Sequence, residues 1–127
     1  MQSLVWIYAA AGYNVALAAF HLGFWRLFRW KEELAKLHPV NRGVVQVMNL
    51  MLVAFLLLMA SVQVLNAAEL TATALGRLLM AGVTGLWLLR AVLQPVFWPS
   101  APKGVNAALI SLFVLGAGLH AVAFGGS

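Results

Sequence analysis

Long apolar runs separated by short polar stretches dominate this chain. Four runs are long enough to cross a bilayer as a helix, which takes about 20 residues. They cover approximately residues 3–25, 43–66, 74–97 and 104–124. Four such runs with short connections predict an all-α integral membrane protein. We expect a four-transmembrane-helix bundle of up-down topology that forms a single domain over residues 1–127.

Prolines and polar residues mark the ends of these runs. Pro39, flanked by polar residues, is expected to stop the first helix, and Pro99 and Pro102 end the third run. Residues 66–73 are polar and predict a short hairpin loop. The first run lacks a positive residue at its start and is longer than the apolar core of a signal peptide. We therefore interpret it as a retained span.

The stretch at residues 25–37 is amphipathic. Trp30 and Leu34 fall on one helical face, and Glu32 and Lys36 have the i, i+4 spacing of an ion pair. One interpretation is a surface helix that contacts lipid or a partner. The other, which we expect, is a short amphipathic cytoplasmic extension of the first helix that is anchored among the headgroups.

Composition agrees with a membrane protein. The chain is 64% hydrophobic and 9% charged, whereas soluble domains are about 45–50% apolar and about 25% charged. It has no cysteine, which excludes disulfides and thiolate chemistry. The net charge of +5 does not indicate nucleic-acid binding. Most of the cations flank an apolar run, where they attract anionic lipid.

The positions of the cations predict the orientation. The connection between the first two runs holds Arg26, Arg29, Lys31, Lys36 and Arg42. Lys103 lies between the third and fourth runs, whereas Glu69 is the charged residue of the remaining connection. Loops rich in Lys and Arg stay in the cytoplasm. We therefore expect both termini outside the cytoplasm, N-out and C-out, in a bacterial inner membrane.

Polar side chains recur at helical spacing inside the runs. Most of one group lie roughly 7–13 Å from the middle of their spans, on the predicted cytoplasmic side. This candidate ligand-binding group consists of His21, Gln46, Asn49, Trp87, Arg90, Gln94 and Asn106. An outer polar group consists of Tyr8, Gln63, Arg77 and His120. A purely structural role is the simpler interpretation, since interhelical hydrogen bonds contribute about 0.6 kcal/mol per pair.

Arg90 is the most informative of these residues. A guanidinium in hydrocarbon is costly, and the three acidic residues, Glu32, Glu33 and Glu69, lie outside the runs. Arg90 can extend to the headgroups, cap amide or carbonyl oxygens, or lie against Trp87 as a cation–π pair. It can also bind an anion, such as a lipid phosphate.

The sequence offers little catalytic or metal chemistry. No two carboxylates lie at membrane depth, where general acid–base catalysis or ion coupling would need them. His21 and His120 are displaced by roughly 10 Å and 9 Å to opposite sides of the midplane, and His38 lies in a connection. We therefore expect no catalytic residue, no metal and no cofactor.

These observations predict a small non-enzymatic membrane protein that acts as an accessory, scaffold or lipid-interacting subunit. Its expected partners are membrane lipids, including anionic ones, and not nucleic acid. A stripe of small residues, Gly12, Ala16, Ala19 and Gly23, allows close helix packing within the bundle or in a homodimer or larger complex. The first alternative is a small transporter or channel for an amphiphilic or anionic solute. The second is a haem- or metal-bearing redox or lipid-modifying enzyme.

Overall fold

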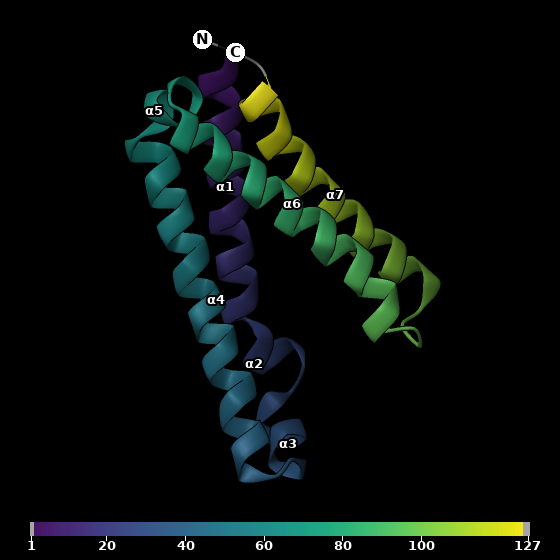
Figure 1. Ribbon diagram of the computed structural model, residues 1–127. Helices are drawn as coiled ribbons and strands as arrows, with labels where there is room; N and C mark the ends of the chain where they lie inside the picture. The colour runs from purple at the N-terminus through teal and green to yellow at the C-terminus, as the bar shows by residue number, and fades with distance from the viewer. Residues whose placement is uncertain (1, 126–127) are drawn as a thin grey trace. The chain divides into compact units, whose positions relative to one another are not determined.

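The computed structural model describes residues 2–125, and this part of the chain is all-helical (Figure 1). The long helices are α1 (Gln2–Leu22), α4 (Pro39–Leu65), α6 (Ala74–Phe97) and α7 (Lys103–Gly125). Shorter elements connect them: α2 (Phe24–Leu27), α3 (Trp30–Glu33), the 3₁₀ helix η1 (Leu34–Lys36) and α5 (Ala67–Ala72). Four helices are long and apolar enough to cross a membrane, over Leu4–Leu22, Pro39–Leu65, Ala74–Phe97 and Lys103–Val122.

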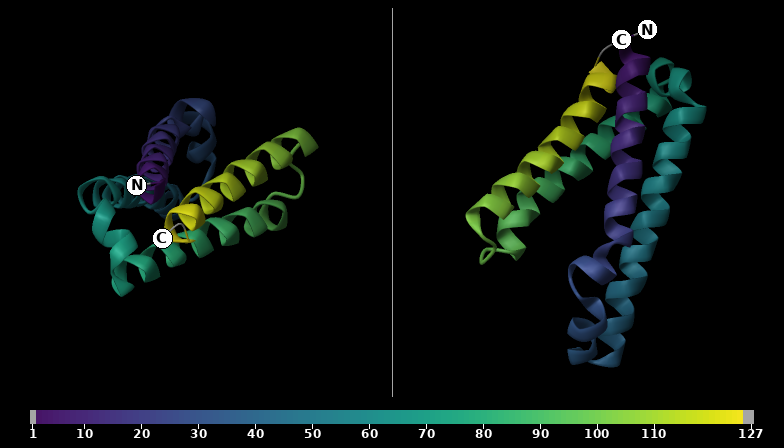
Figure 2. Two further views of the ribbon diagram at one scale, coloured as in Figure 1. Left: turned by 90° about the horizontal axis from the view of Figure 1, so that it is seen from above. Right: turned by 180° about the vertical axis from the view of Figure 1, so that it is seen from behind.

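The chain divides into two compact units. The α1–α4 unit comprises Ala11–Val62, and the α6–α7 unit comprises Met1–Ala10 together with Gln63–Ser127. Each unit contains a pair of long helices that lie side by side and run in opposite directions (Figures 1 and 2). The single-domain organisation and the sides of the termini stay predictions.

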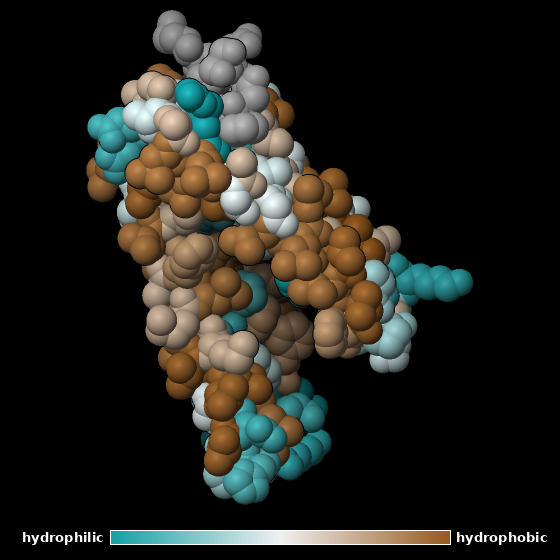
Figure 3. Space-filling model, viewed as in Figure 1, coloured by the Kyte–Doolittle hydropathy of each residue, from teal (hydrophilic) through white to brown (hydrophobic). Residues whose placement is uncertain are grey.

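The long helices bury narrow stripes and expose broad apolar faces. In the α1–α4 unit the buried side chains recur every three or four residues along each helix, and they include Tyr13, Leu17, Val53, Leu56 and Met59. Many large apolar side chains are exposed instead, and brown apolar residues cover much of the face in Figure 3. Such faces suit helices surrounded by lipid, because hydrocarbon solvates them as well as a protein core would.

The first long helix is shorter than the sequence predicts. It ends at Leu22, and the backbone N–H of Gly23 donates to the carbonyls of Ala19 (3.2 Å) and Phe20 (3.0 Å) in a turn. A second break follows at Arg29, whose φ of 52° is left-handed. The expected continuous extension is therefore wrong, because these two breaks divide the segment into α2, α3 and η1.

Helix α4 begins at Pro39, four residues before the predicted start at residue 43. Proline suits the first helical position, where its missing N–H would have no partner in the helix. The His38 side chain caps the new end, since its Nδ1 accepts a hydrogen bond from the Val40 N–H at 3.3 Å. Pro39 therefore starts α4, whereas α1 ends earlier, at Leu22.

The predicted hairpin loop at residues 66–73 folds mostly as α5. Arg77 Nη1 donates to the carbonyl of Thr71 near the end of α5 at 3.2 Å. The Thr73 hydroxyl accepts a hydrogen bond from the Gly76 N–H at 2.9 Å and so caps α6. Pro95 lies inside α6, which continues to Phe97.

The contact between α5 and α6 generates a prediction. A Cβ on Gly76 would lie 2.5 Å from the Glu69 carbonyl oxygen and 2.7 Å from that of Leu70. We expect Gly76→Ala to lower the free energy of unfolding by about 1–3 kcal/mol, because backbone must move. Gly82→Ala is the control, since nothing lies within 4 Å of its Cβ. Thermal unfolding in detergent measures both, and equal stabilities would contradict the packing.

Candidate functional site

The seven candidate ligand-binding residues fall in two clusters. Those of the α1–α4 unit are His21, Gln46 and Asn49, and those of the α6–α7 unit are Trp87, Arg90, Gln94 and Asn106. The contacts described below lie within one unit or the other. That both clusters belong to one layer at one membrane depth stays a prediction.

His21 and Asn49 form a reciprocal pair. The His21 Nδ1 donates to the Asn49 Oδ1 at 3.0 Å, and the Asn49 Nδ2 donates to the backbone carbonyl of His21 at 2.9 Å. The pair forms at the end of α1 because the last carbonyls of a helix have no hydrogen-bond partner within that helix. Asn49 satisfies one of them and thereby ties the end of α1 to α4.

Gln46 forms the next pair, one turn along α4. The Trp25 Nε1 donates to the Gln46 Oε1 at 3.1 Å, and the Gln46 Nε2 donates to the Arg42 carbonyl at 3.2 Å. The sequence identifies Trp25 only as an aromatic residue at the membrane interface and does not reveal this bond. His21, Gln46 and Asn49 therefore hold α1 and α2 against α4.

Gln94 and Asn106 join the facing ends of α6 and α7. The Gln94 Nε2 donates to the Asn106 Oδ1 at 3.0 Å, and Gln94 is only 2% exposed. The Asn106 Nδ2 donates to the Trp98 carbonyl at 3.5 Å. Asn106 thus accepts from the last turns of α6 and also binds the residue that follows this helix. The structure gives this pair a stabilising role at the turn.

Arg90 lies over the ring of Phe113, a residue of α7 that the sequence did not single out. Its guanidinium carbon is 4.3 Å from the centroid of that ring. Trp87 stacks on the same ring, with centroids 5.9 Å apart and planes at 7°. The cation–π contact of Arg90 is therefore with Phe113, whereas Trp87 was one of several partners that the sequence offered. The contact could not be predicted, because the position of Phe113 in the sequence does not indicate which residue of another helix it faces.

The Arg90 side chain is exposed and borders a cleft of about 280 Å³. The other lining residues are Leu93, Gln94, Phe97 and Trp98. No carboxylate lies along α6 or α7, and Glu69 precedes the start of α6. Arg90 lies 16 residues after Ala74, roughly 24 Å along the helix axis. The cleft thus contains the guanidinium of Arg90, the amide of Gln94 and the aromatic rings of Phe97 and Trp98. No acidic residue of α6 or α7 can neutralise the guanidinium.

The four outer polar residues occupy different environments. Gln63 and His120 are 0% exposed, whereas Tyr8 is 51% exposed. The Gln63 Nε2 lies 3.9 Å from the sulfur of Met80, and the His120 Nδ1 lies 2.7 Å from the carbonyl oxygen of Gly116. Arg77 binds the end of α5, as described above. Gln63 and His120 therefore contribute polar groups to the core of the α6–α7 unit.

Comparison of the chain with protein families, with curated proteins and with solved structures finds no match. Within residues 2–125, no group of three His, Asp or Glu residues is placed to hold a metal ion. Among the described side chains of the α6–α7 cluster, the charged one is Arg90. The guanidinium is suited to bind anions such as a phosphate or a carboxylate.

The reciprocal pair between His21 and Asn49 yields a second prediction. Each residue hydrogen-bonds to the other, so the effects of His21→Ala and Asn49→Ala on the free energy of unfolding should not be additive. We expect a coupling energy of about 0.6 kcal/mol, and at most about 2 kcal/mol. A double-mutant cycle of unfolding in mixed detergent measures the coupling. A matched cycle with Ser61→Ala in place of Asn49→Ala should be additive, because Ser61 bonds to Leu57 of its own helix. Additive effects for His21 and Asn49 would contradict the pair.

Proposed function

We propose that this chain is a non-enzymatic integral membrane protein that binds the headgroup of an anionic lipid at Arg90. The observation that carries the proposal is that the exposed residue Arg90 lines the cleft and its guanidinium lies over Phe113. Its role would be that of an accessory or scaffold subunit that retains lipid. This role is the one expected from the sequence.

The contact with Phe113 leaves the charge of Arg90 available. A cation–π contact contributes about 0.5–2 kcal/mol, and it uses no hydrogen-bond acceptor. A guanidinium has five N–H donors in one plane, a geometry that matches the oxygens of a phosphate. Among residues 4–122, we find no group that accepts a hydrogen bond from Arg90. A phosphate would supply both the negative charge and the acceptors.

The position of Arg90 favours a lipid headgroup as the source of that phosphate. Arg90 lies seven residues before Phe97, where α6 ends, which is roughly 10 Å along the helix axis. Phe97 is 80% exposed and Trp98 is 40% exposed. Exposed aromatic side chains at a helix end are typical of the headgroup level. A long Arg side chain can extend towards that level while its methylene groups stay in hydrocarbon.

Removal of the Arg90 charge tests the proposal. We expect Arg90→Gln to weaken the binding of phosphatidylglycerol at this cleft about tenfold or more, because it removes charge-assisted hydrogen bonds. Phosphatidylcholine binding should change little. Native mass spectrometry of the purified protein titrated with each lipid measures the retained molecules. Arg77→Gln is the control, since it removes an equal charge from the same helix but outside the cleft.

Two outcomes would contradict the proposal. Equal retention of phosphatidylglycerol by Arg90→Gln and the parent protein would exclude a headgroup site at Arg90. An Arg90-dependent flux of an anionic solute across liposomes, without selective retention of lipid, would favour the transporter alternative. A folded elution profile and the parent helical circular dichroism spectrum establish that each variant is intact.

We also propose that the termini lie outside the cytoplasm of a bacterial inner membrane. The cationic connection from α2 to η1, together with Lys103, supports this orientation by the positive-inside rule. Since the chain has no cysteine, single cysteines report on one site each. We expect Ala72→Cys to react with an impermeant maleimide in intact spheroplasts, and Ser100→Cys to react only after lysis. The reverse pattern would contradict the orientation.

A further inference from the structure

A second cleft lies in the α1–α4 unit, where α2, α3 and η1 pack beside the start of α4. Its volume is about 410 Å³, within the range of small-molecule sites. Its lining includes Trp25, Trp30, Lys31, Leu34, Arg42 and Gln46. We call it the tryptophan groove. It has two indole walls, an apolar contribution from Leu34 and two cations.

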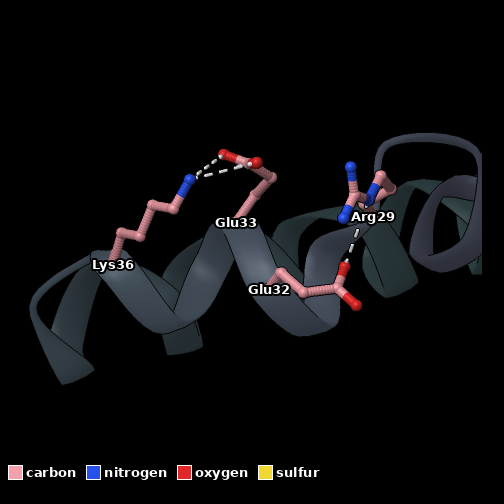
Figure 4. A network of polar contacts seen from close by, with 4 residues as sticks. All are labelled: Arg29, Glu32, Glu33 and Lys36. Carbon is pink, nitrogen blue, oxygen red and sulfur yellow. Dashed lines mark hydrogen bonds and ion pairs between the residues drawn. The ribbon is translucent and has the colours of Figure 1, made fainter.

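The acidic residues of this segment form ion pairs with cations of the same segment (Figure 4). Glu32 lies 3.5 Å from Arg29, and Glu33 lies 3.2 Å from Lys36. The ion pair expected between Glu32 and Lys36 is therefore replaced by two i, i+3 pairs. Neither Arg29 nor Lys36 lines the groove. Lys31, which does, has no carboxylate partner within the described residues.

Arg42 fixes a second positive charge at the groove. Its Nε donates to the Leu34 carbonyl at 3.0 Å, and its Nη2 donates to the carbonyls of Ala35 at 3.3 Å and Leu37 at 3.2 Å. These carbonyls belong to η1 and to Leu37, the residue that follows it. The bonds are made with neutral groups, so they hold the guanidinium in place without neutralising it.

The aromatic walls are also held in place. Trp25 and Trp30 meet edge to face, with ring centroids 5.0 Å apart. Gln46 anchors Trp25 through its indole N–H, and Phe24 packs on Trp30 at 5.7 Å between centroids. The two cations therefore border a groove of defined shape. Pre-organised walls reduce the entropic cost of binding.

We infer that the tryptophan groove binds the phosphate headgroup of an anionic membrane lipid. The charge complementarity of Lys31 and Arg42 selects an anion. Arg42 and Gln46 of α4 line the groove, and Trp25 follows the end of α1 by three residues, so the groove is at the start of one apolar helix and just after the end of the other in the chain. Tryptophan side chains favour the headgroup level, and each Lys or Arg near an anionic lipid surface contributes about 1 kcal/mol. A lipid therefore fits the groove better than a free anion, because its acyl chains would lie along these helices.

This site lies in a different unit from Arg90, and its test is made independent of that residue. Phosphatidylglycerol is titrated into the full-length Arg90→Gln protein, and native mass spectrometry counts the bound lipids. We expect Lys31→Gln in this background to weaken the remaining binding about fivefold. Lys36→Gln is the matched control, since it removes the same charge from a residue that is paired with Glu33 and does not line the groove. It should change binding less than twofold.

Three results would overturn the inference. The first is equal weakening by Lys31→Gln and Lys36→Gln, which would show a diffuse charge effect. The second is the absence of any phosphatidylglycerol binding by the Arg90→Gln protein, or binding that Lys31→Gln leaves unchanged. The third is displacement of the lipid by millimolar inorganic phosphate, which would show a free-anion site. If the Arg90→Gln protein retains as much lipid as the parent protein and only Lys31→Gln weakens lipid binding, the groove site is supported and the proposed site at Arg90 is contradicted.

Discussion

Hydrocarbon provides no water to polar groups, so each polar side chain that a membrane helix carries inward needs a partner in the protein or among the headgroups. The amide and imidazole groups that pair between helices follow that constraint within each unit. His21 with Asn49, and Gln94 with Asn106, each join the two helices of a pair near the end where those helices connect. Asn49 and Asn106 also bind carbonyls at or near helix termini and so satisfy acceptors that the helices leave open.

Arg90 meets the same constraint differently. Its neighbours on α6 and α7 include no acid, and the ring of Phe113 stabilises its charge without accepting its protons. An amide pair can be complete within two helices, whereas a guanidinium over a ring still has donors to satisfy. This contrast separates the amide and imidazole pairs, which join helices, from Arg90, which we assign to a ligand as we do Lys31 and Arg42 of the tryptophan groove.

The apolar runs predicted the four long helices well, because a span needs a minimum length and few charges, and both are visible in the sequence. The sequence failed at the connections. A turn at Gly23 and a left-handed Arg29 divide a segment whose apolar spacing is typical of one helix, and capping by His38 lets α4 begin at a proline. These features depend on local backbone geometry. The polar residues could be picked out of the sequence by their type and their expected depth. Their partners could not, because these depend on how each helix is rotated about its axis. The contact of Arg90 with Phe113 was missed for this reason.

The ring of Phe113 is shared by two side chains that lie one turn apart on α6. Arg90 approaches the ring through its guanidinium, and Trp87 lies almost parallel to it. Any event that draws the guanidinium towards an anion changes the electrostatic field around the ring and around the indole stacked on it. Indole emission is sensitive to such fields. Trp87 is half-buried and stacks on Phe113, so its emission wavelength should respond to a movement of the Arg90 guanidinium.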